Sequence, residues 1–329
     1  MSRENQEFEI MLKLKGLREH EPLSAHTTFG MGGTARYFVE VATPDDLVEA
    51  VTVSREMGLH YAIIAGGSNV VIADGHFGGL VIRICGGEMV LEGYEITVDA
   101  GVQLMALITY VIKNGLGGLE TLSGIPGTVG GALVGNAAAY GQAIGDTIVN
   151  VEIFDPQTGK RETLSHKSCG FRYRDSHFNH HKKGVVILRA RFRFVPAERE
   201  VLEKKSQEII AIRAKKYPPG LRTPGSFFKN LLAEKLPQHV LDTVPNLKDF
   251  YGKVPAWHFL NEVGARGMRH GGLRIADFHG NYIINDGAAT YEDVRELAAE
   301  LKKRVREKFG VELEEEIRYI EPHGEKNEI

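Results

Sequence analysis

Cysteine is scarce in this sequence, and long uncharged hydrophobic runs are absent. The two cysteines, Cys85 and Cys169, offer neither a disulfide framework nor the ligand spacing of a zinc site, so we expect both thiols to serve packing. Residues 1–21 are charged throughout and lack the apolar core of a signal peptide, and no later run is long enough to cross a bilayer. These features predict a cytoplasmic protein.

A strong charge imbalance is absent as well. The formal net charge is −3 at pH 7, so the chain has no general basic field that would attract nucleic acid or an anionic membrane. We therefore expect small-molecule partners held by local groups, no nucleic-acid or membrane partner, and a monomer. With 329 residues, 43% of them hydrophobic, the chain can bury a large core and is long enough for two or three domains.

Two common nucleotide-binding motifs are also missing. The chain has no G-x-x-x-x-G-K-[ST] segment, and the glycine turn Gly66–Asn69 follows a buried strand but leads into another strand, at 70–74. A Rossmann-type domain needs a helix at that point, with its N-terminus on the pyrophosphate. A diphosphate would therefore have to be held by loops and not by a helix dipole.

The most distinctive segment runs from Leu116 to Gly145. Counting from Gly115, ten of 31 residues are glycine, against 38 in the whole chain of 329. Its other residues are mostly small or apolar, unlike those of a flexible linker. Glycine is needed where backbone takes positive φ or approaches another group closely, which favours main chain pressed against a ligand. Residues 123–127 are candidates for an anion-binding nest of N–H groups, with a tight turn between packed strands as the alternative.

Capping signals predict two helices and one boundary. Thr43 is a favourable N-cap for a helix that ends near Met57, and Thr290 caps a helix whose apolar residues repeat at the helical interval up to Gly310. A third helix, opened by Pro196, is broken at 217–220, which we take as the main domain boundary. The part that follows has its own α/β pattern.

Cations without carboxylates gather at this boundary, between residues 209 and 233. They are Arg213, Lys215, Lys216, Arg222 and Lys229. Such a local excess suits a phosphate-bearing ligand, although a solvated boundary loop explains it nearly as well. Ser226 lies in the same stretch. It has no His–Asp partner nearby in sequence and is a poor nucleophile, but it is a candidate proton donor to a strongly basic carbon, with a simple turn residue as the alternative.

Two further groups of polar residues have more than one interpretation. Arg172 and Arg174 flank an aromatic residue, where one guanidinium is a candidate carboxylate clamp and a surface hairpin pair is the default. Glu314 and Glu316 read as a solvated acidic run, except that strand alternation would turn both to the same side. The histidines at 177, 180 and 181 fit no standard metal spacing, so we expect no metal.

Taken together, the segments resemble the UDP-N-acetylenolpyruvoylglucosamine reductases, flavoenzymes of bacterial cell-wall precursor synthesis. The resemblance covers nearly the whole chain, from about residue 26 to 320, and the order of the motifs is as specific as their content. The motifs are HTTFGMGGTARYF, AGGSNVVIADGHFGGLVI, GLGGLETLSGIPGTVGGALVGNAAAYG, FRYRDSHF, GSFFKN and ELEEEIRYI.

The resemblance implies an α+β fold in which a two-lobed FAD-binding domain of the vanillyl-alcohol-oxidase (PCMH) type is followed by a smaller C-terminal α/β substrate domain. We assign residues 1–85 to the first lobe, 86–216 to the second lobe together with a closing strand at 314–325, and 217–313 to the substrate domain. Because only one helix fits between Phe194 and Tyr217, the chain resembles the shorter class of the family, which lacks an extra Tyr-bearing loop over the substrate.

The resemblance also implies roles for single residues. Ser226 matches the proton donor, and Arg174 and Glu316 match the other two active-site positions. Noncovalent FAD would be held by Gly66, Gly67, Ser68, Asn69, Ser123, Gly124, Ile125, Gly127, Gly130, Asn136 and Ala138. The substrate diphosphate would be held by Tyr140, Lys216, Asn230 and Arg318. NADPH would reduce the flavin, and the enolpyruvyl sugar nucleotide would then accept hydride at its vinyl carbon and a proton from Ser226, giving UDP-N-acetylmuramate.

The chain departs from the family pattern at three places: Gly135–Ala139 replaces the more usual M-N-A-G-A, Pro224 replaces an Ala, and Leu231 replaces a Pro. None of these removes a proposed catalytic group. The alternative function is an FAD-dependent oxidase of the same flavin fold that acts on an alcohol or sugar. Many such oxidases tether the flavin to a His in the first glycine loop, and residues 65–69 contain none.

Overall fold

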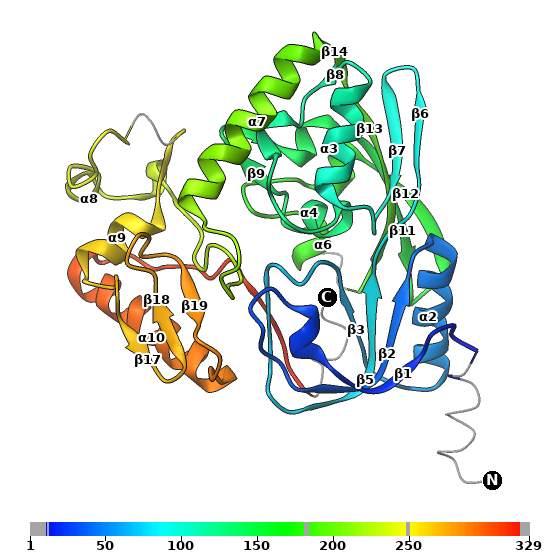
Figure 1. The fold of residues 1–329 in the computed structure, drawn as a ribbon, viewed down its shortest axis with the longest axis horizontal. Helices are drawn as coiled ribbons and strands as arrows, with labels where there is room; N and C mark the ends of the chain where they lie inside the picture. Colours follow the sequence, from blue (N-terminus) through cyan, green and yellow to red (C-terminus); the bar gives the residue numbers. More distant parts are fainter. Residues whose placement is uncertain (1–10, 12, 181–183, 248–250, 323–329) are drawn as a thin grey trace.

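The computed structural model describes residues 11, 13–180, 184–247 and 251–322 and has three parts, each built on a β-sheet (Figure 1). The N-terminal part lies below the second part in this view, and the C-terminal part lies beside them. The predicted mixture of helices and sheets, with a separate C-terminal domain, is confirmed. Within the described residues, no helix is both long and apolar enough to cross a membrane.

The first part is a four-stranded sheet in the order β1-β2-β5-β3. Its strands are β1 Arg18–Pro22, β2 Thr34–Val41, β3 Tyr61–Ile64 and β5 His76–Ile84. Strand β5 pairs in parallel with both β2 and β3, and α2 Pro44–Glu56 connects β2 to β3. This helix begins as predicted, because the Thr43 side chain accepts a hydrogen bond from the Asp46 N–H at 3.1 Å.

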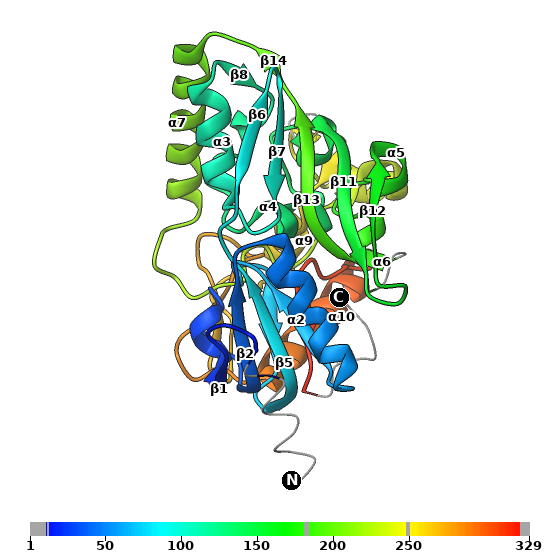
Figure 2. The same ribbon diagram turned by 90° about the vertical axis from the view of Figure 1, so that its right-hand side faces the viewer.

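The second part is a five-stranded antiparallel sheet in the order β12-β11-β13-β7-β6. Its strands are β6 Met89–Glu92, β7 Glu95–Asp99, β11 Ile148–Asp155, β12 Lys160–Ser165 and β13 Val186–Arg193. Its helices are α3 Leu104–Lys113, α4 Val129–Val134, α5 His166–Cys169, α6 His177–His180 and α7 Arg199–Lys216. Figure 2 shows α3 and α7 on one side of this sheet and α5 at its β12 edge. Two short strand pairs complete it, β8 Leu116–Gly117 with β14 Val195–Pro196 and β9 Ala138–Ala139 with β10 Gln142–Ala143.

One hydrophobic core continues from the second part into the first. It includes Val39 and Leu47 of the first part, together with Leu107, Val151 and Phe192 of the second. All five side chains are buried because sheet faces and helix stripes can leave water only by packing against one another. The two lobes are therefore joined by packing as well as by the chain.

The C-terminal part packs α10 Tyr291–Phe309 and α9 Ala256–Glu262 against small sheets. Its other described elements are β15 Leu231–Leu232, the 3-10 helix η4 Ala233–Lys235, α8 Gln238–Leu241, β16 Lys253–Val254, β17 Arg269–His270, β18 Leu273–Ile275 and β19 Ile283–Asn285. Thr290 caps α10 as predicted, in a capping box with Asp293, and Gly310 ends α10 in the left-handed conformation. This core also takes in Phe29 and Met31 of the first part, which fixes the domain against the lobe.

The closing strand lies elsewhere than predicted. Strand β20, Arg318–Ile320, pairs in parallel with β4, Val70–Ile72, which belongs to the first lobe and not the second. Regular pairing is also shorter than the predicted 314–325, because residues 314–316 turn instead toward the segment that carries Ser226. Residues 323–325 lie outside the described part of the chain. The consequence is that the C-terminal segment ties the first glycine turn to the C-terminal domain.

Candidate active site

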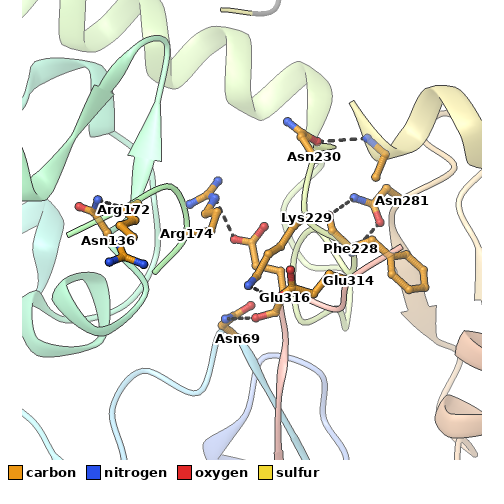
Figure 3. A network of polar contacts seen from close by, with 11 residues as sticks. Asn69, Asn136, Arg172, Arg174, Phe228, Lys229, Asn230, Asn281, Glu314 and Glu316 are labelled. Carbon is orange, nitrogen blue, oxygen red and sulfur yellow. Dashed lines mark hydrogen bonds and ion pairs between the residues drawn. The ribbon is translucent and has the colours of Figure 1, made fainter. Parts of the chain in front are cut away.

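The loop that carries Ser226 is held in place by one buried amide. The N–H of Phe228 donates to Asn281 Oδ1 at 2.8 Å, and Asn281 Nδ2 donates back to the Phe228 carbonyl at 2.8 Å (Figure 3). Phe227 and Phe228 are both buried, with their rings edge to face. Gly225, at φ 87°, supplies the left-handed turn that lets the chain enter this tight loop. Ser226 therefore sits on a fixed backbone.

The closing segment lines the other side of this loop. The Glu316 N–H donates to the Phe227 carbonyl at 2.8 Å, so Glu316 lies beside the residue that follows Ser226. Asn69 Nδ2 donates to the Glu316 carbonyl at 3.1 Å, and the Arg318 N–H donates to the Asn69 carbonyl at 3.0 Å. Three segments that are far apart in sequence thus meet at Glu316.

Arg174 completes this meeting point from the second lobe. Its Nε lies 3.2 Å from Glu316 Oε1, and the two side chains are only 25% and 18% exposed. Arg174 has φ 51°, within a tight turn closed by the Arg172 N–H and the Asp175 carbonyl at 2.9 Å. Burial raises the pKa of the Glu316 carboxyl, and the charges of Arg174 and Lys229 oppose this only in part. A carboxyl whose charged form is disfavoured by burial thus lies beside a guanidinium.

The two glycine turns lie in contact. A Cβ on Gly66 would stand 3.0 Å from the Gly127 Cα, and Ser68 Oγ donates to the Pro126 carbonyl at 3.5 Å. Gly67 has φ 62°, and a Cβ there would stand 2.0 Å from the His26 carbonyl oxygen. A side chain at Gly66 would press on the second glycine turn, and one at Gly67 would collide with the backbone at His26, so both positions require glycine.

Gly67→Ala is expected to lower the free energy of unfolding by about 1–3 kcal/mol more than Gly93→Ala does. Gly93 has a similar φ of 63° with no atom within 4 Å, so its substitution adds backbone strain without a clash. Urea titration of both variants measures the difference. Equal losses in the two variants would show that the turn relaxes around the methyl group.

Several predicted cofactor residues already have structural partners. The N–H groups of Ser123 and Ile125 donate within the loop, to Glu120 and Leu122 carbonyls at 3.3 and 3.1 Å. These bonds occupy two of the N–H groups that the predicted anion-binding nest at residues 123–127 would use, and Pro126 has no N–H to add. The Ser123 hydroxyl also bonds to Ser206 at 2.7 Å.

Two further positions in the glycine-rich segment serve packing. Asn136 holds the segment by donating to the Arg172 carbonyl at 2.8 Å and accepting from the Gly145 N–H at 3.0 Å. A Cβ on Gly130 would stand 2.9 Å from that of Ala100. Ala138 lies in the short strand β9.

The predicted substrate residues are spread around the site. Tyr140 has φ 50° in the β9–β10 turn and is 38% exposed, and Lys216 Nζ lies 5.2 Å from the centroid of the Tyr217 ring. Asn230 Oδ1 accepts from the Ala256 N–H at 3.2 Å, and Arg318 donates to Asn179 Oδ1. Burial lowers the pKa of Arg318. Among the described residues, no hydrogen bond or ion pair joins any two of these four.

Arg213 is the strongest single indication of an anionic ligand. Its side chain lies over the Gly124 backbone, where a Cβ would stand 3.4 Å from Arg213 Nε, and its guanidinium lies 5.3 Å from the centre of the Tyr217 ring. The buried Nε has no hydrogen-bond partner, no carboxylate of the described part of the chain pairs with the side chain, and burial lowers its pKa. The sequence identified this residue only as one of five cations, because which of them faces the loop depends on how α7 packs.

The donor set fits a flavin dinucleotide. The Arg213 Nε is a buried donor without a partner beside the glycine-rich loop, and a diphosphate is a group that such a guanidinium binds. By contrast, the described residues hold no cluster of three His, Cys, Asp or Glu side chains suited to a metal ion. His181 lies outside the described residues.

Comparison with known proteins gives the class first. Residues 35–165 match the model of an FAD binding domain, so the two-lobed part is that of a flavoprotein. Residues 217–320 match the model of the C-terminal domain of UDP-N-acetylenolpyruvoylglucosamine reductase.

Relatives over the whole length give the family. A UDP-N-acetylenolpyruvoylglucosamine reductase from Solibacter usitatus is 42% identical over 91% of this chain and 95% of its own, and one from Geobacter metallireducens is 34% identical over 94% and 96%. The crystal structure of the Thermus caldophilus enzyme superposes with a TM-score of 0.71 at 30% identity, covering 92% of this chain and 99% of its own. The chain belongs to the UDP-N-acetylenolpyruvoylglucosamine reductase family.

Proposed function

We propose that the protein reduces the enolpyruvyl group of UDP-N-acetylglucosamine enolpyruvate to give UDP-N-acetylmuramate, with NADPH as the electron donor, for peptidoglycan precursor synthesis. The observation that carries this proposal is the half-buried Arg174–Glu316 pair beside the Ser226 loop and the first glycine turn. FAD, when bound, carries the hydride from NADPH to the substrate. The remaining chemistry falls to side chains of this chain.

In this proposal three residues share the chemistry. Hydride addition at the vinyl carbon leaves negative charge on the adjoining carbon and its carboxylate, where the Arg174 guanidinium stabilises it. Glu316, whose charged form burial disfavours, is assigned to polarise the same charge through a shared proton or water. Ser226 donates its hydroxyl proton to the carbon. A serine suffices because a carbanion is a far stronger base than an alkoxide.

Binding roles form the second part of the proposal. We infer that the backbones of Gly66–Asn69 and Ser123–Gly127, with Arg213, hold the FAD diphosphate, and that Gly130, Asn136 and Ala138 shape the loop behind it. The sugar-nucleotide diphosphate is assigned to Tyr140, Lys216, Asn230 and Arg318. No His occurs in residues 65–69, which supports noncovalent flavin. Cytoplasmic residence and a monomeric state stay predictions, supported by composition alone.

The absorption spectrum of the pure protein tests the proposal. We expect a yellow protein that bleaches with anaerobic NADPH and recovers its colour when the enolpyruvyl nucleotide is added. Acid precipitation should release the flavin into the supernatant, because no covalent bond holds it. If an alcohol or sugar with oxygen sustained turnover while the enolpyruvyl nucleotide left the reduced flavin unchanged, the oxidase alternative would be correct.

A further inference from the structure

Three consecutive glutamates, at 314–316, lie in the segment that leads into β20, and each is paired with a different cation. The partners are Lys229 for Glu314, Lys302 for Glu315 and Arg174 for Glu316. These cations come from the Ser226 loop, from α10 and from the second lobe, and Figure 3 shows the Glu316 carboxylate extending toward Arg174. Because adjacent carboxylates are chemically alike, the partners of the other two decide which one reaches Arg174.

Glu315 is held by two groups at once. Its Oε1 accepts a hydrogen bond from the Lys302 ammonium, and its Oε2 accepts one from the Tyr319 hydroxyl at 2.5 Å. The side chain is only 14% exposed. A half-buried carboxylate with a charged and a neutral donor is costly to release, because its charge would lose both partners while it stays partly desolvated. Both oxygens of Glu315 are therefore engaged away from Arg174.

The bond between Tyr319 and Glu315 encloses the bend that presents Glu316. Tyr319 lies in β20, four residues after Glu315, and Glu316 lies between the two. Four residues of extended strand span about 13 Å, so this direct bond requires the chain to bend between its ends. Pairing with β4 begins only at Arg318, which leaves Glu316 outside the ladder. The side-chain bond thus fixes the segment at a point where strand pairing does not.

The Tyr319 ring is in turn fixed against α10. The guanidinium carbon of Arg295 lies 4.6 Å from the ring centroid, and the Tyr291 ring meets it edge to face at 5.6 Å. Burial and then the Glu315 carboxylate raise the pKa of the Tyr319 hydroxyl, which therefore stays protonated and remains a donor. Helix α10, through Lys302 and this ring, provides a fixed support for Glu315.

We propose that Glu315, held by Lys302 and Tyr319, is a positioning residue that sets the register of the closing segment so that Glu316 faces Arg174. The inference rests on the proposed function, in which Glu316 acts on the developing charge. A shift of one residue would turn every side chain of the segment to the opposite side and bring Glu315 toward Arg174 instead. The two bonds to Glu315 oppose that shift, because both would have to break.

Tyr319→Phe tests the assignment in the FAD-loaded protein, since it removes the hydroxyl that holds Glu315 and keeps the ring. We expect reoxidation of the flavin by the enolpyruvyl nucleotide to slow about 3–10-fold, the factor that corresponds to one lost hydrogen bond. Reduction by NADPH and the Michaelis constant for the nucleotide should change little. Lys302→Met should act in the same direction, and Lys302→Arg should recover most of the rate. Glu312→Gln, which removes an exposed carboxylate from the same segment, should match the wild type.

The same change in a Glu316→Gln background separates positioning from general support of the fold. If Glu315 acts through Glu316, Tyr319→Phe should cause little further loss once Glu316 has been replaced, because both changes remove one contribution. Fully additive losses would overturn the inference. Equal slowing of both half-reactions in Tyr319→Phe, or wild-type reoxidation in that variant, would overturn it as well.

The placement of Glu316 is also measured without the nucleotide. The free energy of unfolding of Glu316→Gln minus that of its parent depends on pH, because burial raises the pKa of Glu316 against the charges of Arg174 and Lys229. We expect a smaller pH dependence when the parent carries Tyr319→Phe, since Glu316 is then held less firmly in its buried place. An unchanged dependence would contradict the positioning role. A wild-type protein that is not reoxidised by the enolpyruvyl nucleotide would contradict the proposed function instead, and the unfolding measurement would still decide the role of Glu315.

Discussion

Ser226→Ala is expected to leave reduction of the flavin by NADPH intact and to slow its reoxidation by the enolpyruvyl nucleotide by about 10²–10⁴-fold, the range typical of lost general-acid help. The reason is that the hydroxyl is needed only when a carbon must be protonated. The loop itself should survive, because its position depends on backbone bonds and on Asn281, and not on the serine side chain. Anaerobic stopped-flow measurement of the two half-reactions separates the effects.

Ser168→Ala is a suitable control for this experiment, since Ser168 is exposed on α5 at the edge of the second lobe. Both half-reactions should match those of the wild type. Equal slowing of both half-reactions in Ser226→Ala would mean that the hydroxyl shapes flavin binding, and the assignment as proton donor would then be wrong. Full reoxidation at the wild-type rate would leave the proton donor to be sought at Glu316.

Local signals in the sequence predicted individual elements well. The helices that begin after Thr43 and Thr290 were predicted from an N-cap residue, and both caps are formed in the structure. The break after α7 was likewise predicted from local residues, the two prolines and the glycine at 217–220. Caps and breaks depend on residues that are neighbours in sequence, so no knowledge of packing is needed to identify them.

Long-range pairing was harder to predict. An apolar alternation shows that residues 311–320 are extended but carries no information about which strand they join, and the second lobe was the wrong choice. The alternation also suggested that Glu314 and Glu316 share one side. Instead, Glu314 is 69% exposed and Glu316 only 18%, because the segment bends between the Ser226 loop and Asn69. Regular strand geometry does not hold where two partners compete for one segment.

The resemblance supplied Arg174 and Glu316 as separate residues, and the structure shows how they become a pair. Neither spacing nor charge indicates that a turn in the second lobe reaches the closing segment. Likewise, glycine content predicted main chain pressed against a ligand, but could not show that Gly66 approaches Gly127 or that Ser123 and Ile125 use their N–H groups inside the loop. Which donors remain free is decided by turns several residues away.

Glu316→Gln is expected to reduce turnover on the order of 10²-fold or more, because the amide keeps the shape of the side chain but cannot share a proton with the developing charge. The amide oxygen can still face Arg174, so the site should remain assembled and flavin content should be unchanged. Steady-state turnover and flavin absorbance of the same preparation measure both effects. Normal turnover in this variant would rule out proton sharing by Glu316.

Although Glu316→Gln should lower turnover, it should favour stability, and its advantage over the wild type in free energy of unfolding should grow with pH. Since burial raises the folded-state pKa of Glu316 above its unfolded value, wild-type stability is fully present at pH values below the unfolded pKa and declines as pH rises through the folded pKa. Glutamine has no such titration. The free energy of unfolding of Glu316→Gln minus that of the wild type should therefore increase with pH above about 4.5, where the unfolded carboxyl ionises.

Urea unfolding of the FAD-saturated proteins at pH 5 and pH 8 measures this difference, and Glu307→Gln, on the exposed face of α10, controls for the loss of a surface charge. A difference that shrinks as pH rises would mean that Arg174 and Lys229 stabilise the carboxylate more than burial disfavours it. Glu316 would then be ionised during turnover and unable to donate a hydrogen bond. An increase with pH, together with lost turnover, would show that this carboxyl is kept at a cost in stability because catalysis needs its proton.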